Sequence, residues 1–378
     1  MRPKRAVSMA AATATTALVA ATVAAMSTGV AVAAPPAAPP SAPAAASVPA
    51  VPTVPPVDLG GLPGLLYTNA TAINDHGDVV GSGYSSPYDN HGFRWSQGAL
   101  TALPDTARAP FRINNAGQIA GTLPGRFYSP GFVLRPDGTV VALDFSTSDQ
   151  NERGEVVGTG PVTGGGTHAK LWRDNHTFDL GAPAGHTSDA RAISSNGWIL
   201  GEIQDSSHGD DYFARWIRGR WVPLPTPSGY GSDINGRGDV VGWVTNADGV
   251  THAMLWQGDH AIDLDPTDPL STAVAINDAG QILGDTFDPV TNIGRILLWD
   301  HGQQIDLGTF GGLFTRPIAL NQRGDIIVGT STAAFRRSHG RTVQLGGVGA
   351  WPAAINNRGQ VVGTIQAPDG TSHAALWN

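Results

Sequence analysis

Short apolar stretches alternate with turns rich in Gly and Asn from residue 57 to the end of the sequence. The stretch at 72–81, Ala-Ile-Asn-Asp-His-Gly-Asp-Val-Val-Gly, shows the pattern: an apolar strand end, a polar turn and a second apolar run. Asn folds its side chain onto nearby backbone N–H groups, and the Gly three residues later accepts the positive φ of the turn. The stretch therefore predicts a β-hairpin.

This hairpin recurs at intervals of 35 to 44 residues. Its turns begin at Asn74, Asn114, Asn151, Ser194, Asn235, Asn277, Asn321 and Asn356. Each repeat adds a third strand-like segment, such as 252–256, and a fourth, such as 262–264. Four antiparallel strands in roughly 40 residues make one blade of a β-propeller.

The two ends of the repeat region complement each other. The last repeat stops after its third strand at 373–378, and a fourth-strand sequence, Val-Asp-Leu-Gly at 57–60, precedes the first hairpin. If this N-terminal strand completes the last blade, no sheet edge stays open. The sequence therefore predicts an all-β fold, a single β-propeller of eight four-stranded blades closed by its N-terminal strand. Seven blades with one irregular repeat is the alternative.

Three motifs follow one another in the repeats: Ala-Ile-Asn-x-x-Gly-x-Val-Val-Gly, His-Ala-x-Leu-Trp and Asp-Leu-Gly. In this combination, over 57–378, the chain resembles the bacterial extracellular HAF-repeat family, named for a His-Ala-Phe core. The resemblance implies a secreted β-repeat protein, and it supplies neither an activity nor catalytic residues. Some repeats depart from the pattern, with Ser194 at one turn and Arg295 at one of the His positions.

The first 56 residues differ in composition from the repeats. Residues 1–33 have a basic start and a long Ala/Val/Thr-rich run that ends in Ala-Val-Ala, as a secretory signal peptide does. Residues 34–56 are nearly all Ala, Pro, Val and Ser, which indicates a semi-rigid linker. We therefore expect a signal peptide at 1–33, a linker at 34–56 and a propeller at 57–378. The mature protein is predicted to be extracellular, with no membrane span after signal cleavage.

Composition narrows the classes of function. The 49 Gly and 28 Pro indicate many turns and little helix. The absence of Cys from the sequence excludes disulfides and thiolate metal sites. A formal net charge of −8 makes nucleic acid a poor partner, because phosphate binding needs clustered basic side chains. We expect a monomer.

Known catalytic signatures are missing from the sequence. It contains no Gly-x-Ser-x-Gly elbow, no His-Glu-x-x-His and no phosphate-binding loop followed by a helix. Glutamate occurs only at 152, 155 and 202, so a glycosidase would have to pair aspartates from different blades. We therefore assign no catalytic residues and favour a protein that is not an enzyme.

Several recurring polar residues have a structural explanation. Four histidines share one third-strand position: His91, His168, His252 and His373. We expect each ring to bond to a neighbouring blade, and the tryptophans near the end of the same strand to pack between blades. The Arg-Gly-Asp tripeptides at 237–239 and 323–325 are copies of the ordinary hairpin turn, so we do not interpret them as adhesion motifs.

Two acidic loops are candidates for binding a metal ion. The loops at 205–211 and 263–268 cluster carboxylates, the ligands that Ca²⁺ prefers, but neither has the spacing of a helix-loop-helix calcium site. We expect solvated turns, with a structural Ca²⁺ as the alternative, and we assign no metal-binding residue and no other cofactor.

Aromatic residues that depart from the repeat are the best candidates for binding. Trp198 stands where the other seven repeats have a polar residue, Trp243 follows a second-strand Gly, and Trp351 lies in the last connection between blades. The predicted ligand-binding set is Trp198, Trp243, Trp351, Tyr84, Tyr88, Tyr128, Asp210 and Asp211. We expect these residues on the face formed by the loops after the second strands, where aromatic side chains could bind a ligand.

Three hypotheses for function follow. The favoured one is a secreted, non-catalytic binding or scaffold propeller that recognises an extracellular glycan, peptide or protein through its aromatic face. The first alternative is a hydrolase or lyase of extracellular polysaccharide with aspartates at the mouth of the central channel. The second alternative is a structural repeat protein of the cell surface.

Overall fold

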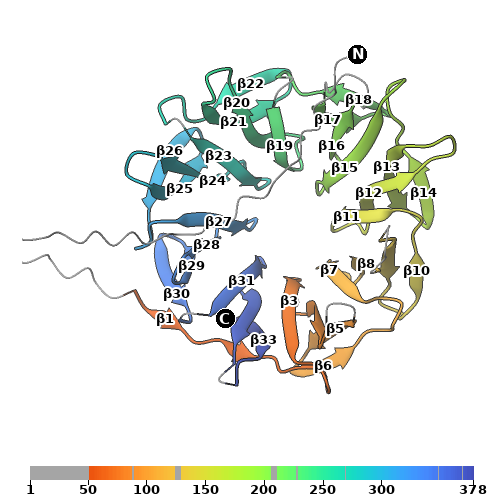
Figure 1. Cartoon of the computed structure of the whole chain (residues 1–378), viewed down its shortest axis with the longest axis vertical. Helices are drawn as coiled ribbons and strands as arrows, with labels where there is room; N and C mark the ends of the chain where they lie inside the picture. The colour runs from red at the N-terminus through yellow and green to blue at the C-terminus, as the bar shows by residue number, and fades with distance from the viewer. Residues whose placement is uncertain are drawn as a thin grey trace, which may run out of the picture. The chain divides into compact units, whose positions relative to one another are not determined.

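The structure is a computed structural model, which describes residues 51–86, 89–123, 129–205, 211–226, 229–268, 270–347, 349–367 and 369–378. Every regular element in these segments is a β-strand. The described residues belong to one compact unit. In Figure 1 their strands form a ring, and the first strand of each hairpin lies innermost.

Strands that follow one another in the chain pair in antiparallel groups, each of which corresponds to one predicted blade. The first group is β3 (Tyr67–Ile73), β4 (Val79–Tyr84), β5 (Asn90–Ser96) and β6 (Ala99–Ala102). The second is β7 (Ala109–Ile113), β8 (Ile119–Thr122), β9 (Gly131–Leu134) and β10 (Val140–Ala142). The third is β11 (Ser146–Gln150), β12 (Val156–Pro161), β13 (Thr167–Arg173) and β14 (His176–Asp179). The fourth is β15 (Thr187–Ile193), β16 (Ile199–Gln204), β17 (Tyr212–Ile217) and β18 (Arg220–Pro223).

The same order continues to the end of the chain. The fifth group is β19 (Gly229–Ile234), β20 (Val240–Thr245), β21 (Thr251–Gln257) and β22 (His260–Asp263). The sixth is β23 (Ser271–Ile276), β24 (Ile282–Asp288), β25 (Ile293–Asp300) and β26 (Gln303–Gly308). The seventh is β27 (Thr315–Leu320), β28 (Ile326–Thr330), β29 (Ala334–Ser338) and β30 (Arg341–Leu345). The eighth is β31 (Ala350–Ile355), β32 (Val361–Gln366) and β33 (Ser372–Trp377), joined by the N-terminal β2 (Val57–Asp58).

The N-terminal strand closes the last group as the sequence predicts. Within the antiparallel pair β2–β33, Val57 lies opposite Leu376 and Asp58 opposite Ala375. The Leu59 N–H donates to the Ala374 carbonyl at 2.9 Å, which extends the pairing by one residue. The prediction of an all-β, single β-propeller with this closure is confirmed. A second short strand, β1 (Thr53–Val54), pairs in parallel with Gln344 and Leu345 of β30, inside the segment predicted as linker.

The core lies between neighbouring groups. One apolar cluster joins Leu200 and Phe213 of the fourth group to Val240 and Trp256 of the fifth. Trp256 is fully buried, and its indole N–H donates to the Thr226 hydroxyl of the preceding group at 2.6 Å. The predicted packing of such tryptophans between blades is therefore confirmed here. Burial of aromatic and aliphatic side chains between blades is the main favourable term that holds the ring together.

Each inner strand carries a β-bulge at the same place, two to four residues before its turn, as between Gly231 and Asp233 of β19. The glycine of the second strand, Gly242, pairs with Gly231 beside this bulge. A Cβ atom on Gly242 would lie 1.8 Å from the Tyr230 carbonyl oxygen, so no larger residue fits there. The glycine of the Val-Val-Gly motif is thus required by close backbone approach.

Candidate functional site

The hairpin turns form a continuous set of hydrogen bonds, which we call the hairpin belt. The Asn74 side-chain oxygen accepts from the N–H groups of His76 and Asp78 at 3.0 and 2.9 Å. Its amide nitrogen donates to the carbonyl oxygen of Asn114, the turn residue of the next group, at 3.1 Å. The last turn closes the circle, because Asn356 donates to the Asn74 carbonyl oxygen at 2.9 Å.

The residues that follow the turn asparagines form a second set of contacts. The Asn357 N–H donates to Asp75 at 2.7 Å, the Asp75 N–H to Asn115 at 2.7 Å, and the Asn115 N–H to Glu152 at 2.8 Å. These side chains line a small polar cavity of about 210 Å³. Burial raises the pKa of Glu152, whereas hydrogen bonds from Asn357 and Asn115 outweigh burial and lower the pKa of Asp75. Because these polar groups bond to one another across neighbouring groups, they join the hairpin turns around this cavity.

Three charged residues replace the Ala of the Ala-Ile-Asn motif on the inner strands. The Arg112 guanidinium contacts Asp149 at 2.9 Å, and Asp149 also accepts from the Ile193 N–H at 3.0 Å. Asp233 accepts from the Ile276 N–H at 3.0 Å. Burial, and to a smaller extent the charge of Asp149, raises the pKa of Asp233 to about 7. Sequence reasoning missed these residues, although their departure from Ala is visible in the repeat alignment.

Three of the eight predicted binding residues, Tyr88, Tyr128 and Asp210, lie outside the described residues. Trp198 lies just before β16, beside the hairpin turn, and its ring covers Gly238 of the next group. It is therefore at the opposite end of the second strand from Tyr84, the last residue of β4. The expectation that Trp198 shares a face with the other predicted residues is therefore wrong. Trp198 follows the turn glycine directly, so it lies next to the start of the second strand and not in the loop at its end.

Trp243 packs against other side chains of the protein. Its ring stacks on Tyr230, with centroids 4.1 Å apart and an angle of 18° between the planes. Tyr230 in turn contacts Phe213, and the Arg191 guanidinium lies over both of these rings. Arg191 also forms an ion pair with Glu202. This cluster stabilises the junction of the fourth and fifth groups.

Tyr84 and Trp351 are the two predicted residues that the structure brings together. Both line a cavity of about 230 Å³ at the junction of the eighth and first groups, and Tyr84 stacks on Tyr67 with centroids 5.3 Å apart. Trp351 remains 50% exposed. The last predicted residue, Asp211, is exposed and accepts from the Asp205 N–H at 2.9 Å, so that it closes its own loop.

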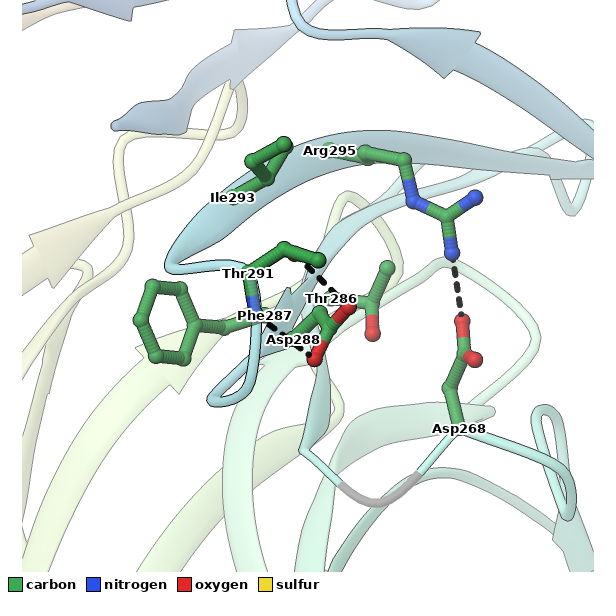
Figure 2. Close-up of a pocket in the computed structure, with 7 residues that line it drawn as sticks. All are labelled: Asp268, Thr286, Phe287, Asp288, Thr291, Ile293 and Arg295. Carbon is green, nitrogen blue, oxygen red and sulfur yellow. Dashed lines mark hydrogen bonds and ion pairs between the residues drawn. The ribbon is translucent and has the colours of Figure 1, made fainter. Parts of the chain in front are cut away.

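A larger cavity of about 300 Å³ lies beside the loop that joins β24 and β25 (Figure 2). Arg295 takes the place of the repeat histidine and contacts Asp268 at 3.0 Å and Asp306 at 2.9 Å. Asp288 accepts from the Val290 N–H and the Thr291 hydroxyl, and these bonds lower the pKa of its carboxyl group. Sequence reasoning recorded Arg295 only as a departure from the motif.

The four repeat histidines contact residues of their own group or of the connection that follows it, so the expected bond to a neighbouring blade is wrong. His168 contacts Asp179 at 2.9 Å and His373 contacts Asp58 at 2.8 Å, in each case on the fourth strand of the same group. The fourth-strand aspartate of the Asp-Leu-Gly motif faces the third-strand histidine because the two strands pair directly.

The Arg-Gly-Asp tripeptides are part of the hairpin belt. The carboxylates of Asp239 and Asp325 are buried and accept from Asn235 and Asn321 at 3.1 and 2.9 Å. A receptor could not reach them without opening the turn. Among the described residues, no group of three or more His, Cys, Asp or Glu side chains could hold a metal ion. The described residues also include no helix long and apolar enough to cross a membrane.

No protein-family model and no curated protein matches the sequence. Solved structures of similar fold include the β-propeller domain of the Trilobed protease from Pyrococcus furiosus. That match has a TM-score of 0.53 and 13% identity, and it covers 75% of this chain and 100% of that one. Prolyl oligopeptidase B from Galerina marginata matches with a TM-score of 0.53 and 9% identity, over 82% of this chain and 56% of that one.

A structure from a study of two prolyl endopeptidases matches with a TM-score of 0.52 and 13% identity, over 82% of this chain and 53% of that one. The chain thus spans about half the length of the prolyl peptidases that it matches. The fold and these comparisons together define the class of the molecule, a β-propeller.

The comparisons correct the functional hypotheses from the sequence. The similar structures named above are the propeller domain of a protease and structures of prolyl peptidases, which contradicts a non-catalytic scaffold for glycans or peptides as well as a polysaccharide hydrolase or lyase. The hypothesis of a structural repeat protein of the cell surface is corrected on the same ground. The aromatic departures from the repeat indicated a ligand face, and they carried no information on the class of ligand or partner.

Proposed function

We propose that this chain is a peptidase-associated propeller, a ring that works together with a peptidase catalytic domain. One observation carries the proposal: the match to the Trilobed protease propeller extends over 100% of that chain. The prolyl peptidases add that a similar ring can make up about half of a peptidase polypeptide. The catalytic domain belongs either to a separate protein or to a further part of the same polypeptide.

The construction of the ring supports this role. The hairpin belt and the closing strand β2 join every group to its neighbours, so that the ring has no unpaired edge at its closure. Such a ring presents its faces to a partner in a fixed geometry, and pre-organisation lowers the entropic cost of binding. The sequence supplies no Gly-x-Ser-x-Gly elbow, so we assign the peptide-cleaving nucleophile to the partner domain.

The expectation of export is part of the proposal. Residues 1–33 have the composition of a secretory signal peptide, and the repeats resemble those of an extracellular family. The peptidase partner would then act outside the cell. Recovery of the tagged chain from the culture medium, with an N-terminus after residue 33, would support this point.

Purification of the tagged full chain from its source organism after mild cross-linking tests the association. The eluate is labelled with a fluorophosphonate, which reacts with serine-hydrolase nucleophiles, and is assayed with a fluorogenic prolyl peptide. We expect a labelled protein that co-elutes and cleaves the peptide, absent from a tag-only control. An eluate that contains the intact ring but neither a labelled hydrolase nor any peptide cleavage would overturn the proposal.

A further inference from the structure

The cavity beside the β24–β25 loop combines an apolar floor with charged walls. Phe287 and Ile293 supply the apolar side (Figure 2). Phe287 stacks on Phe314, with ring centroids 6.3 Å apart, and Phe314 remains 60% exposed. An aromatic pair that is open to solvent at the rim of a cavity offers apolar area to a ligand.

Carboxylates outnumber cations at this cavity. Arg295 is held between two of them, with one guanidinium nitrogen on Asp268 and another on Asp306. Asp288 adds a third negative charge on the opposite wall, where its contacts are hydrogen bonds from Val290 and Thr291. The local charge is therefore negative, and this field attracts a cation.

The arrangement in the sixth group differs from that in the third and eighth groups. In the third and eighth groups, the same third-strand position holds a histidine that contacts one aspartate of its own fourth strand, as His168 contacts Asp179. Here Arg295 also reaches Asp268, which lies in the connection from the preceding group. The ring geometry of the repeat does not require this additional contact.

We propose that this cavity binds a small organic ammonium ion that carries an apolar or aromatic group. The ammonium lies on the Asp288 carboxylate, beside the Thr286 and Thr291 hydroxyls, and the apolar group lies on Phe287 and Ile293. A carboxylate has about four lone-pair sites, so the three hydrogen bonds that Asp288 accepts within its turn leave it able to bind. This inference goes beyond the proposed function, because it concerns a small ligand and not the peptidase partner.

Titration of the purified full chain with phenethylamine tests the site, with 2-phenylethanol as the neutral ligand of the same shape. We expect saturable binding of the amine with a dissociation constant on the order of 1 mM, as for a fragment-sized ligand, and binding of the alcohol at least about tenfold weaker. Added salt should weaken only the amine. Equal binding of amine and alcohol, or no saturable binding of the amine, would overturn the proposal.

Two matched variants locate the effect. Asp288→Asn keeps an oxygen that can accept from Val290 and Thr291 but removes the charge, so amine binding should weaken about tenfold with the melting temperature unchanged. Asp369→Asn is the control, because Asp369 accepts from the N–H and hydroxyl of Thr371 in a similar turn that does not line this cavity. The proposal fails if Asp288→Asn has no effect, or if both variants weaken binding equally.

One more comparison identifies the source of the ammonium. Phenethylamine and the dipeptide Phe-Gly share the ammonium group and the ring. Tighter binding of the dipeptide would assign the site to a peptide amino terminus, and equal binding would assign it to free amines. Both outcomes support the site, and neither depends on finding a peptidase partner.

Discussion

The two ends of the inner strands contrast sharply. At the hairpin end six of the eight groups repeat the same contacts, in which a buried turn Asn caps its own turn and donates to the next one. At the loop end the groups differ: one carries the Arg295 cluster, another the stacked Tyr230 and Trp243, and a third the half-exposed Trp351. The same repeat therefore produces a uniform end and a variable end.

This contrast separates stability from function. Most polar groups at the hairpin end bond to one another inside the protein, so that removing one leaves its buried partner without a hydrogen bond. Cavities occur at both ends, of about 540 and 210 Å³ at the hairpin end and of about 300 and 230 Å³ at the loop end. The two at the loop end have exposed aromatic side chains in or beside their lining. We infer that substitutions at the hairpin end act on folding and that those at the loop end act on binding.

The largest effect is expected from Asn277→Ala at the hairpin belt. Asn277 is 1% exposed, accepts from the Gln281 N–H at 2.9 Å and donates to the Asn321 carbonyl oxygen at 3.1 Å. Removal leaves both groups buried without their partner, which costs about 3 kcal/mol of the free energy of unfolding. Urea denaturation followed by tryptophan fluorescence measures this loss.

Asn277→Ser is the matched control for this prediction. Ser194 occupies the same turn position in the fourth group, where its hydroxyl accepts from the Trp198 N–H at 3.0 Å. Serine keeps the acceptor for the turn and loses the donor to the next group, so we expect about half the loss of the Ala variant. If both variants are as stable as the natural chain, the belt does not hold the ring and the comparison fails.

The hairpin end is also the part that the sequence predicts best. Asn, Gly and the apolar run at 72–81 recur because hairpin geometry demands them, and the closing strand at 57–60 can be recognised by its Asp-Leu-Gly motif. Local physics therefore sets these contacts in each repeat, and comparing repeats within one chain reveals them.

The loop end could not be predicted in the same way. The Arg295 contact with Asp268 depends on how two neighbouring groups pack, and no local rule joins residues 27 positions apart. Trp198 and Trp243 both depart from the repeat, yet one lies beside a turn and the other stacks inside a cluster. A departure from the repeat marks a position as unusual, but its partners follow only from the three-dimensional arrangement.

Asp233→Asn sharpens the comparison, because Asp233 is a departure from the repeat that lies at the hairpin end. Burial raises the pKa of Asp233 to about 7, above the value of about 3.9 in an unfolded chain. Its contribution to stability is thus complete below about pH 4 and is lost as the pH rises through about 7. Relative to Asp233→Asn, the natural chain should lose about 2 kcal/mol between pH 4 and 8, after allowance for partial exposure.

Urea denaturation of both proteins from pH 4 to pH 8 measures the difference. The Asn variant keeps one oxygen for the Ile276 N–H, so the two proteins should approach each other at the acid end. A difference that does not change with pH would show that the Asp233 carboxyl titrates normally, and the inner strands would then tolerate charge as readily as the loop end.

Trp351→Ala probes the loop end itself. Because Trp351 is half exposed at the rim of the 230 Å³ cavity, its removal should cost only about 1 kcal/mol. The matched control is Trp256→Ala, which empties a fully buried site between two groups and should cost about 4 kcal/mol. Similar losses for the two variants in urea denaturation would mean that the loop end is as structural as the core.

The smallest effect is expected from Asp58→Asn, which removes the carboxylate that His373 contacts at the closure of the ring. The two side chains are 48% and 28% exposed, and partly exposed ion pairs contribute about 0.5 kcal/mol. Asp179→Asn is the internal control, because Asp179 contacts His168 at 2.9 Å in the third group, where no chain end is involved. Asp179 also contacts Lys170 at 3.1 Å, so the loss for Asp179→Asn is an upper bound for a histidine contact of this kind. Equal losses for the two variants in urea denaturation would place the strength of the closure in the β2–β33 backbone pairing and in the Asn356–Asn74 contact of the hairpin belt. A much larger loss for Asp58→Asn would show that a contact near the loop end holds the ring closed, and the division between a structural and a functional end would not apply at the closure.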